Sequence, residues 1–217
     1  QELIEALVRD ARAHGCKAVV VTFDPDPDVV VSPSPAQKLM TTVDRLHALA
    51  QTGVDAVVAV PFTPEVAALD HVDFLSLVSR LVDIRSIRVG SDFRLGRGGA
   101  SGVAEMRAWG SEHGVDVYGH DLLCEGGEAI CATRIRHELG QGHVELAAEL
   151  LGRPYIVRGG VTRGRHEGSD MGFPTANLQV PDGIQVPADG VYEGLVLVDD
   201  TVWPAAVNVG LGTRSEE

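Results

Sequence analysis

Three short stretches combine residue types that can bind phosphate or a divalent cation. The first, residues 172–177 (GFPTAN), includes Pro174 and places Thr175 and Asn177 two residues apart. On a strand both side chains would point to one face, where a hydroxyl and an amide oxygen can ligate Mg²⁺ or contact a phosphate. A turn and strand without chemistry is the alternative. The preceding spaced glycines could form a lid whose amides reach phosphates: Gly160, Gly164, Gly168 and Gly172.

The second stretch, Thr133-Arg134-Ile135-Arg136, is expected to open a helix that runs to Leu139. The free N–H groups at a helix start suit an anion, and the forked guanidinium groups of Arg134 and Arg136 add donors. Two cations are unfavourable there as mere surface charge, because the helix dipole is positive at this end. A solvated helix face is the alternative.

The third stretch, residues 90–96 (GSDFRLG), follows a short predicted strand, and α/β proteins bind ligands at such strand ends. Gly90 allows close backbone approach, and Asp92 can accept from a ribose hydroxyl. The glycines form neither a GxGxxG nor a GxxxxGK[ST] motif, so an ordinary connection is the alternative. Residues 24–27 (DPDP) follow another predicted strand and are expected to form a proline-stiffened turn within a long loop.

The elements that must position these stretches change character near residue 151. Before it, helical spacing alternates with continuous β-branched runs, which predicts a doubly wound, Rossmann-like parallel α/β sheet. After it, glycines are dense and helices are absent, which predicts a smaller antiparallel β-barrel or sandwich. The expected helices are 3–11, 42–49, 72–81, 103–113 and 133–139. The expected strands are 18–23, 56–60, 87–89, 115–118, 155–161, 190–198 and 201–209.

Composition excludes several classes of protein. The 217 residues include 18 basic and 31 acidic side chains, and a net charge of −13 repels nucleic acid. With 44% apolar residues the chain is not disordered, and no apolar run reaches membrane-spanning length. Three scattered cysteines and the lack of a secretory signal at the start indicate reduced thiols in a cytoplasmic protein. The sequence does not define an oligomeric state.

In combination, six stretches resemble, in order, the bacterial bifunctional riboflavin kinase/FAD synthetase family over essentially the whole chain. They are residues 21–25, 39–42, 90–96, 133–136, 148–155 and 172–177. The hexapeptide 172–177 is the most specific of them, since it is the hallmark of the flavokinase module. The resemblance implies an FMN adenylyltransferase (FAD synthetase) domain at residues 1–151, lacking its first strand, and a partial riboflavin kinase barrel at residues 152–217.

The resemblance also implies two reactions that need ATP and Mg²⁺, one converting riboflavin to FMN and the other FMN to FAD. Thr133, Arg134 and Arg136 would lie at the ATP phosphates of the first site. Thr175 and Asn177 would hold Mg²⁺–ATP in the kinase site, beneath the glycine loop. The strand-end wall near nucleotide or flavin would comprise Gly90, Asp92 and Phe93.

The chain also departs from the family pattern. The usual His-x-Gly-His motif would precede Gln1, and the catalytic Glu of the kinase would follow Glu217. Asp26 stands where His is usual, Leu95 where Phe is usual, and Cys131-Ala132 where two Ser are usual. A degenerate flavin- or nucleotide-binding homologue without turnover therefore stays as an alternative. Another type of nucleotidyltransferase would explain the first domain and leave the second unexplained.

Overall fold

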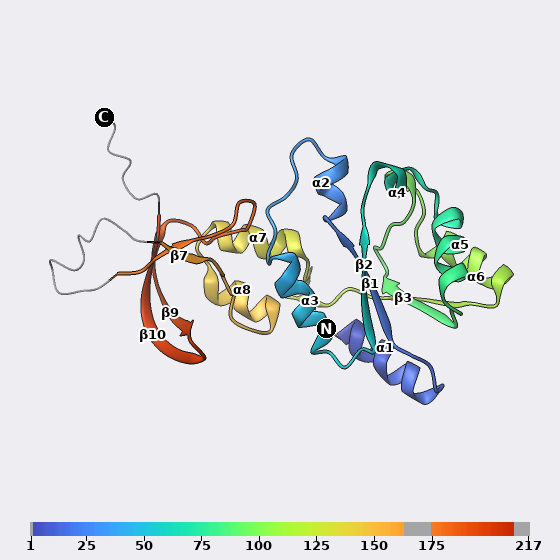
Figure 1. Cartoon of the computed structure of the whole chain (residues 1–217), viewed down its shortest axis with the longest axis horizontal. Coiled ribbons are helices and arrows are strands. Elements are labelled where there is room, and N and C mark those ends of the chain that lie inside the picture. Colours follow the sequence, from blue (N-terminus) through green and yellow to red (C-terminus); the bar gives the residue numbers. More distant parts are fainter. Residues whose placement is uncertain (1, 163–174, 211–217) are drawn as a thin grey trace. The chain divides into compact units, whose positions relative to one another are not determined.

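The computed structural model describes residues 2–162 and 175–210 and divides the chain into two compact units (Figure 1). The first unit contains Gln1–Ala36 and Thr41–Ala129, and the second contains Gln37–Met40 and Ile130–Glu217. The first unit is α/β, and the part of the chain after Leu151 is β-rich. The expected change from α/β to β structure near residue 151 is therefore confirmed. In the described residues, no helix is both long enough and apolar enough to cross a bilayer.

Helices and strands alternate through the first unit. Its elements are α1 (Glu2–Ala13), β1 (Val19–Asp24), α2 (Pro27–Val31), α3 (Thr42–Ala50), β2 (Ala56–Pro61), α4 (Pro64–Ala68), α5 (His71–Leu81), β3 (Ser86–Gly90), the short 3-10 helix η1 (Arg97–Gly99), α6 (Val103–His113), β4 (Asp116–His120), β5 (Cys124–Glu125) and β6 (Glu128–Ala129). Three helices of this unit, α3, α4 and α5, start at side-chain caps that accept backbone N–H groups, as helix starts require. Thr41 Oγ1 accepts from Asp44 N at 3.1 Å, and Asp70 Oδ1 accepts from Asp73 N at 2.8 Å.

The loop expected over residues 24–35 is interrupted by a helix that the sequence analysis missed. Pro27 is the first residue of α2, where its fixed φ and missing N–H are tolerated. The same explanation holds for Pro64 at the start of α4, which was also missed. Pro27 and Pro64 are therefore helix-start residues and do not mark coil.

The strands of the first unit form two parallel pairs. In the first, Val19 of β1 lies opposite Ala56 of β2, and the register continues to Asp24 and Pro61. In the second, β3 pairs with β4 from Ser86 and Asp116 onward. The single continuous sheet expected from the sequence is not seen in the described residues, because no backbone hydrogen bonds join one pair to the other. Each βαβ unit has formed its own parallel pair.

The core of the first unit lies between α5, α6 and the β3–β4 pair. Its buried residues are Phe74, Leu75, Leu95, Met106, Trp109, Val115 and Val117. Gly110 of α6 lies so close to the chain after the helix that a Cβ there would meet Val115 O at 2.3 Å. This close approach presses α6 against β4 and fixes the segment between them.

Helix α1 is held to the sheet by ion pairs. Arg12 Nη1 lies 2.7 Å from Asp55 Oδ2, and the same carboxylate oxygen accepts from Ala18 N at 2.8 Å. These hydrogen bonds lower the pKa of Asp55 to about 2, and the bond from Arg12 has the largest effect on this pKa. On the other side of α1, Arg88 of β3 contacts Asp10 at 2.9 Å.

The second unit begins with two helices and continues with antiparallel strands. Its elements are α7 (Ala132–Gly140), α8 (Val144–Leu151), β7 (Gly160–Thr162), β8 (Asn177–Gln179), β9 (Gly190–Val198) and β10 (Thr201–Val209). In the described residues β7 pairs only with β8 and β9 only with β10, so the expected barrel is not seen there. The expected strand at 155–161 is also wrong, because the strand begins at Gly160.

A four-residue segment of the N-terminal half belongs to the second unit. Leu39 packs against the core formed by Ile135, Leu139, Ala147 and Leu150. Lys38 N donates to Gly183 O at 2.7 Å, and Gln185 N donates to Lys38 O at 2.8 Å. Nearby, Tyr155 packs on the same core and donates its hydroxyl to Gln185 O at 2.7 Å. Burial of this phenol raises the pKa of Tyr155 to about 12.

Candidate functional site

A cavity of about 200 Å³ lies in the first unit, where β1, β2 and β3 end. Its wall combines the loop after β1 with α2, the end of β2 with α4, one residue of α5, and the loop after β3. The lining residues are Phe23, Pro27, Val31, Phe62, Val66, Ala67, Leu69, Phe74, Arg94, Leu95, Gly96, Gly98 and Gly99. Carboxyl ends of parallel strands are where α/β proteins bind ligands, so position and lining both indicate a binding site.

Three phenylalanines form one wall of the cavity. The Phe23 ring lies edge-on to Phe62 at a centroid distance of 5.1 Å and tilted to Phe74 at 5.8 Å. Such packed aromatic side chains present a stiff apolar surface that suits a flat ring system. Phe62 directly follows β2, and Phe74 lies in α5. The sequence analysis did not predict Phe62 or Phe74 as site residues. The position of Phe62 just after the strand expected at 56–60 could have indicated it, because ligands bind at such strand ends.

The opposite rim of the cavity is the loop after β3. Arg94 brings a cation to the lining, and Gly96, Gly98 and Gly99 leave the backbone exposed. The loop is fixed at both ends, because Leu95 and Ser101 exchange two backbone hydrogen bonds of 2.8 and 3.0 Å. Just after the loop, Gly102 N donates to Glu105 Oε2 at 2.7 Å, which lowers the pKa of Glu105. A rigid rim with one cation and open backbone can orient a polar substituent on the ring that the cavity holds.

Of the sequence-predicted residues, Gly90 is the last residue of β3, and Asp92 and Phe93 belong to the loop after it. None of the three is among the residues that line the cavity. Asp92 is exposed, and a Cβ at Gly90 would meet its Oδ1 at 2.8 Å. Phe93 packs against the core cluster. The loop was therefore located from the sequence, whereas the cavity uses the residues that follow.

The predicted phosphate-binding residues Thr133, Arg134 and Arg136 share the first turns of α7 in the second unit. Thr133 is exposed, and both arginines are half-buried. Arg136 Nε donates to Gln37 O, which orients this guanidinium. Cys131, the N-cap of α7, makes no side-chain capping bond, so the first backbone N–H groups are not capped by it.

The predicted kinase residues are only partly within the described chain. Gly164, Gly168, Gly172 and Pro174 lie outside the described residues. Thr175 precedes β8, so it is not on the strand as expected, and Asn177 is the first residue of β8. Both are exposed. Gly160 lies within β7, paired with Gln179, which makes it a strand residue and not part of a loop.

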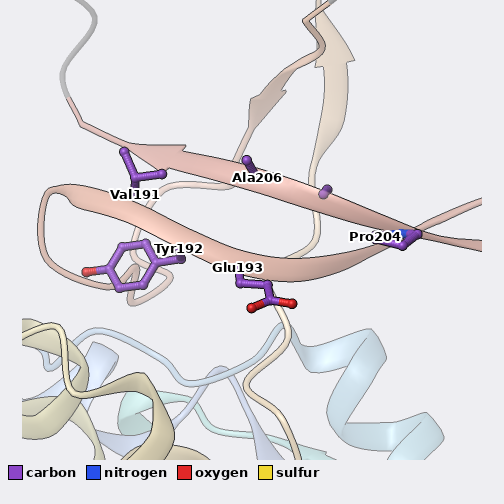
Figure 2. Close-up of a pocket in the computed structure, with 6 residues that line it drawn as sticks. Val191, Tyr192, Glu193, Pro204 and Ala206 are labelled. Carbon is purple, nitrogen blue, oxygen red and sulfur yellow. The ribbon is translucent and has the colours of Figure 1, made fainter.

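A larger hollow of about 460 Å³ lies on the β9–β10 hairpin. Figure 2 shows this hollow on the two paired strands, with Tyr192 and Glu193 extending from β9. Its other lining residues are Val191, Pro204, Ala205 and Ala206. Glu193 is its one charged residue, and Val191 is 76% exposed. A shallow apolar surface with a single carboxylate offers no group for phosphate, so we favour the smaller cavity.

Two family models together cover most of the chain. The model described as FAD synthetase matches residues 1–134, and the one described as riboflavin kinase matches residues 151–216. The Escherichia coli K12 protein named bifunctional riboflavin kinase/FMN adenylyltransferase is 32% identical over 211 residues, which is 96% of this chain and 67% of that protein. The chain belongs to this bifunctional family.

Further relatives agree with that assignment. The bifunctional riboflavin kinase/FMN adenylyltransferase of Bacillus subtilis is 29% identical over 97% of this chain and 67% of its own length. A crystal structure described as a macrolide-efflux protein from Streptococcus pneumoniae superposes with a TM-score of 0.87 at 27% identity, covering 96% of this chain and 68% of the other. Its fold therefore matches that of this bifunctional family member closely.

In this member of the riboflavin kinase/FMN adenylyltransferase family, the candidate groups fall in two separate units. The cavity and the loop after β3 belong to the first unit, whereas α7, Thr175 and Asn177 belong to the second. Within the described residues there is no group of three or more His, Cys, Asp or Glu side chains placed to hold a metal ion. The side-chain oxygen donors of Thr175 and Asn177 are neutral ones, a hydroxyl and a carboxamide.

Proposed function

We propose that this protein makes flavin cofactors, phosphorylating riboflavin to FMN with ATP and then adenylylating FMN to FAD. The observation that carries the proposal is the match of both family models, in order, along one chain. A binding protein without turnover, the alternative raised by Asp26 and Cys131-Ala132, is not favoured by relatives that are named as enzymes over nearly the whole chain. The partners are the small molecules ATP, riboflavin and FMN.

Residues 1–151 carry the adenylyltransferase chemistry in this proposal. The flavin ring occupies the cavity against Phe23 and Phe62, and the FMN phosphate attacks the α-phosphorus of ATP as pyrophosphate leaves. Thr133, Arg134 and Arg136 stabilise the charge on the ATP phosphates, which is where such a reaction gains most. Gly90, Asp92 and Phe93 form the neighbouring strand-end wall near the nucleotide. The two parallel pairs are parts of one doubly wound sheet.

The kinase chemistry belongs to the second unit, where the 5′-hydroxyl of riboflavin attacks the γ-phosphorus of ATP. Thr175 and Asn177 fit Mg²⁺, because a hydroxyl and a carboxamide are hard oxygen donors and both side chains are exposed to an incoming nucleotide. Thr175 and Asn177 would hold Mg²⁺, which would neutralise phosphate charge. Gly164, Gly168, Gly172 and Pro174, which lie outside the described residues, contact the nucleotide in this proposal, and Gly160 precedes them in β7. In this proposal, β7 to β10 are part of a flavokinase barrel.

The proposed domain boundary and compartment follow from the same reasoning. Residues 1–151 form the adenylyltransferase domain and residues 152–217 belong to the kinase domain. The protein works in the cytoplasm, which is consistent with three unpaired thiols at Cys16, Cys124 and Cys131. It acts without nucleic acid or membrane, since its net charge of −13 opposes both anionic surfaces.

Separation of the two activities tests the proposal. In full-length protein, Arg134→Ala should lower FMN adenylylation about 100-fold or more, because a charge-assisted phosphate contact is lost, and leave riboflavin phosphorylation intact. Asn177→Ala should do the reverse, with added FMN still converted to FAD. Chromatography of the flavins in each reaction gives both rates. Thermal melts of each variant separate loss of turnover from loss of fold.

Two matched variants control for unrelated effects. Arg9→Ala removes an exposed arginine from α1, and Gln179→Ala shortens the next residue on the same face of β8. Both should keep both activities. Unconverted riboflavin with verified full-length wild-type protein would refute the whole proposal. Equal loss of both activities in folded Arg134→Ala would refute the division of the two activities between residues 1–151 and residues 152–217.

A further inference from the structure

The loop between β1 and α2 is fastened to α3 by two polar contacts. Thr42 Oγ1 donates to Asp24 Oδ1 at 2.9 Å, and Arg45 Nη1 pairs with the carboxylate of Asp26. The Asp26 and Arg45 side chains are only about a quarter exposed, at 26% and 23%. Because they are largely withdrawn from water, this pair is screened much less than a surface ion pair.

Arg45 also contacts a second group in this segment, the backbone oxygen of Phe23. Its Nη2 donates to the backbone oxygen of Phe23 at 2.7 Å, while its Nε is buried and has no hydrogen-bond partner among the described residues. The planar fork of an arginine makes the two contacts from two different nitrogens in a fixed geometry, which the single nitrogen of a lysine does not reproduce. One side chain therefore fixes two points of the chain, three residues apart.

Those two points carry one wall of the cavity. The Phe23 ring lines the cavity directly, and Asp26 is the N-cap of α2, whose Pro27 and Val31 line it as well. Without a link between these points, α2 could move relative to the Phe23 ring and change the width of the cavity. Arg45 itself is not among the lining residues, so it acts through its neighbours.

We propose that Arg45 is a positioning residue that sets the width of the flavin-binding cavity by holding Asp26 and the Phe23 carbonyl together. This inference rests on the proposed function, which places the flavin ring in this cavity. A ring that fits loosely is bound less tightly but reacts normally once bound, because the reacting phosphate of FMN is at the end of the flexible ribityl chain, away from the ring. The expected signature is therefore a raised KM for FMN with an almost unchanged kcat.

The test compares substitutions of Arg45 in full-length protein. Arg45→Lys keeps the charge but loses the fixed fork, so the KM for FMN in adenylylation should rise about tenfold, the equivalent of one charge-assisted hydrogen bond. Arg45→Met should raise the KM further, and the double variant Arg45→Met/Asp26→Asn also removes the charge of the partly withdrawn Asp26 carboxylate if the single variant does not fold. In all three, kcat should stay within about twofold and riboflavin phosphorylation should not change.

Two further variants separate the possible outcomes. Arg85→Lys alters an arginine that pairs with Asp83 at the surface, and it should leave the KM unchanged. Phe62→Ala alters the cavity wall itself and should raise the KM for FMN. If Arg45→Lys folds with a lowered melting temperature but has a normal KM for FMN, the positioning role is overturned. A raised KM in Phe62→Ala would then still support the cavity as the site that binds flavin. A normal KM in Phe62→Ala would overturn both.

Discussion

Gly96 and Gly98 both line the cavity with positive φ angles, yet we expect alanine to be tolerated at only one of them. Gly98 has φ 62° and ψ 16°, the left-handed helical region, and a Cβ there would meet nothing within 4 Å. Gly96 has φ 80° and ψ 177°, a region that is essentially restricted to glycine. A Cβ at Gly96 would also lie 2.9 Å from His71 N and 3.3 Å from Asp70 C.

The structure gives the size of this difference. Gly98→Ala should cost about 1 kcal/mol of unfolding free energy, the usual penalty for a left-handed L-residue. Gly96→Ala should cost more, for two reasons. The backbone penalty is about 1–3 kcal/mol, and the clash with the capped first turn of α5 costs a further ~1–3 kcal/mol through overpacking. Asp70 cannot retreat easily, because it caps α5 through its bond to Asp73 N.

Thermal unfolding and FMN kinetics together measure the effect. At roughly 3 °C per kcal/mol for a unit of this size, Gly96→Ala should lower the melting temperature of the first unit by about 10 °C and Gly98→Ala by about 3 °C. Gly98→Asn should be milder still, because Asn adopts the left-handed region more readily. Only Gly96→Ala should also raise the KM for FMN, while riboflavin phosphorylation stays unchanged. Equal melting temperatures for the two alanine variants would refute the reasoning.

Two predictions concern pH. The raised pKa of Tyr155 means that the folded state favours the neutral phenol, so this stabilisation is complete below the unfolded pKa of 10.0 and is lost as pH rises towards about 12. Urea unfolding of wild type and Tyr155→Phe at pH 9 to 12 should show a steeper loss of stability in wild type; parallel curves would contradict this. The lowered pKa of Asp55 has the opposite sign: its stabilisation is present above the unfolded value of 3.8 and is lost as pH falls towards about 2. Asp55→Asn should be less stable than wild type at pH 6, and the difference should shrink towards pH 2 in the same assay; a constant difference would show that the ionised carboxylate is not responsible.

The sequence predicted best those elements that local pattern alone determines. The bounds of α6, β9 and β10 agree with the expected ranges, since helical spacing and β-branched runs are local signals. The proline-led helices α2 and α4 were missed because proline also indicates coil. The site was found only in part: the loop after β3 was expected, but the wall formed by Phe62 and Phe74 exists only once β2 and α5 are packed together.

The segment Gln37–Met40 has a consequence for how the protein is made. Its partners Gly183 and Gln185 lie about 145 residues further along the chain, so these pairings must wait until that part has left the ribosome. Such distant contacts slow folding, because a long loop must close before they form. We expect Leu39 of a nascent chain to stay exposed to solvent until α7 and α8, which supply the core that it packs against, have been synthesised.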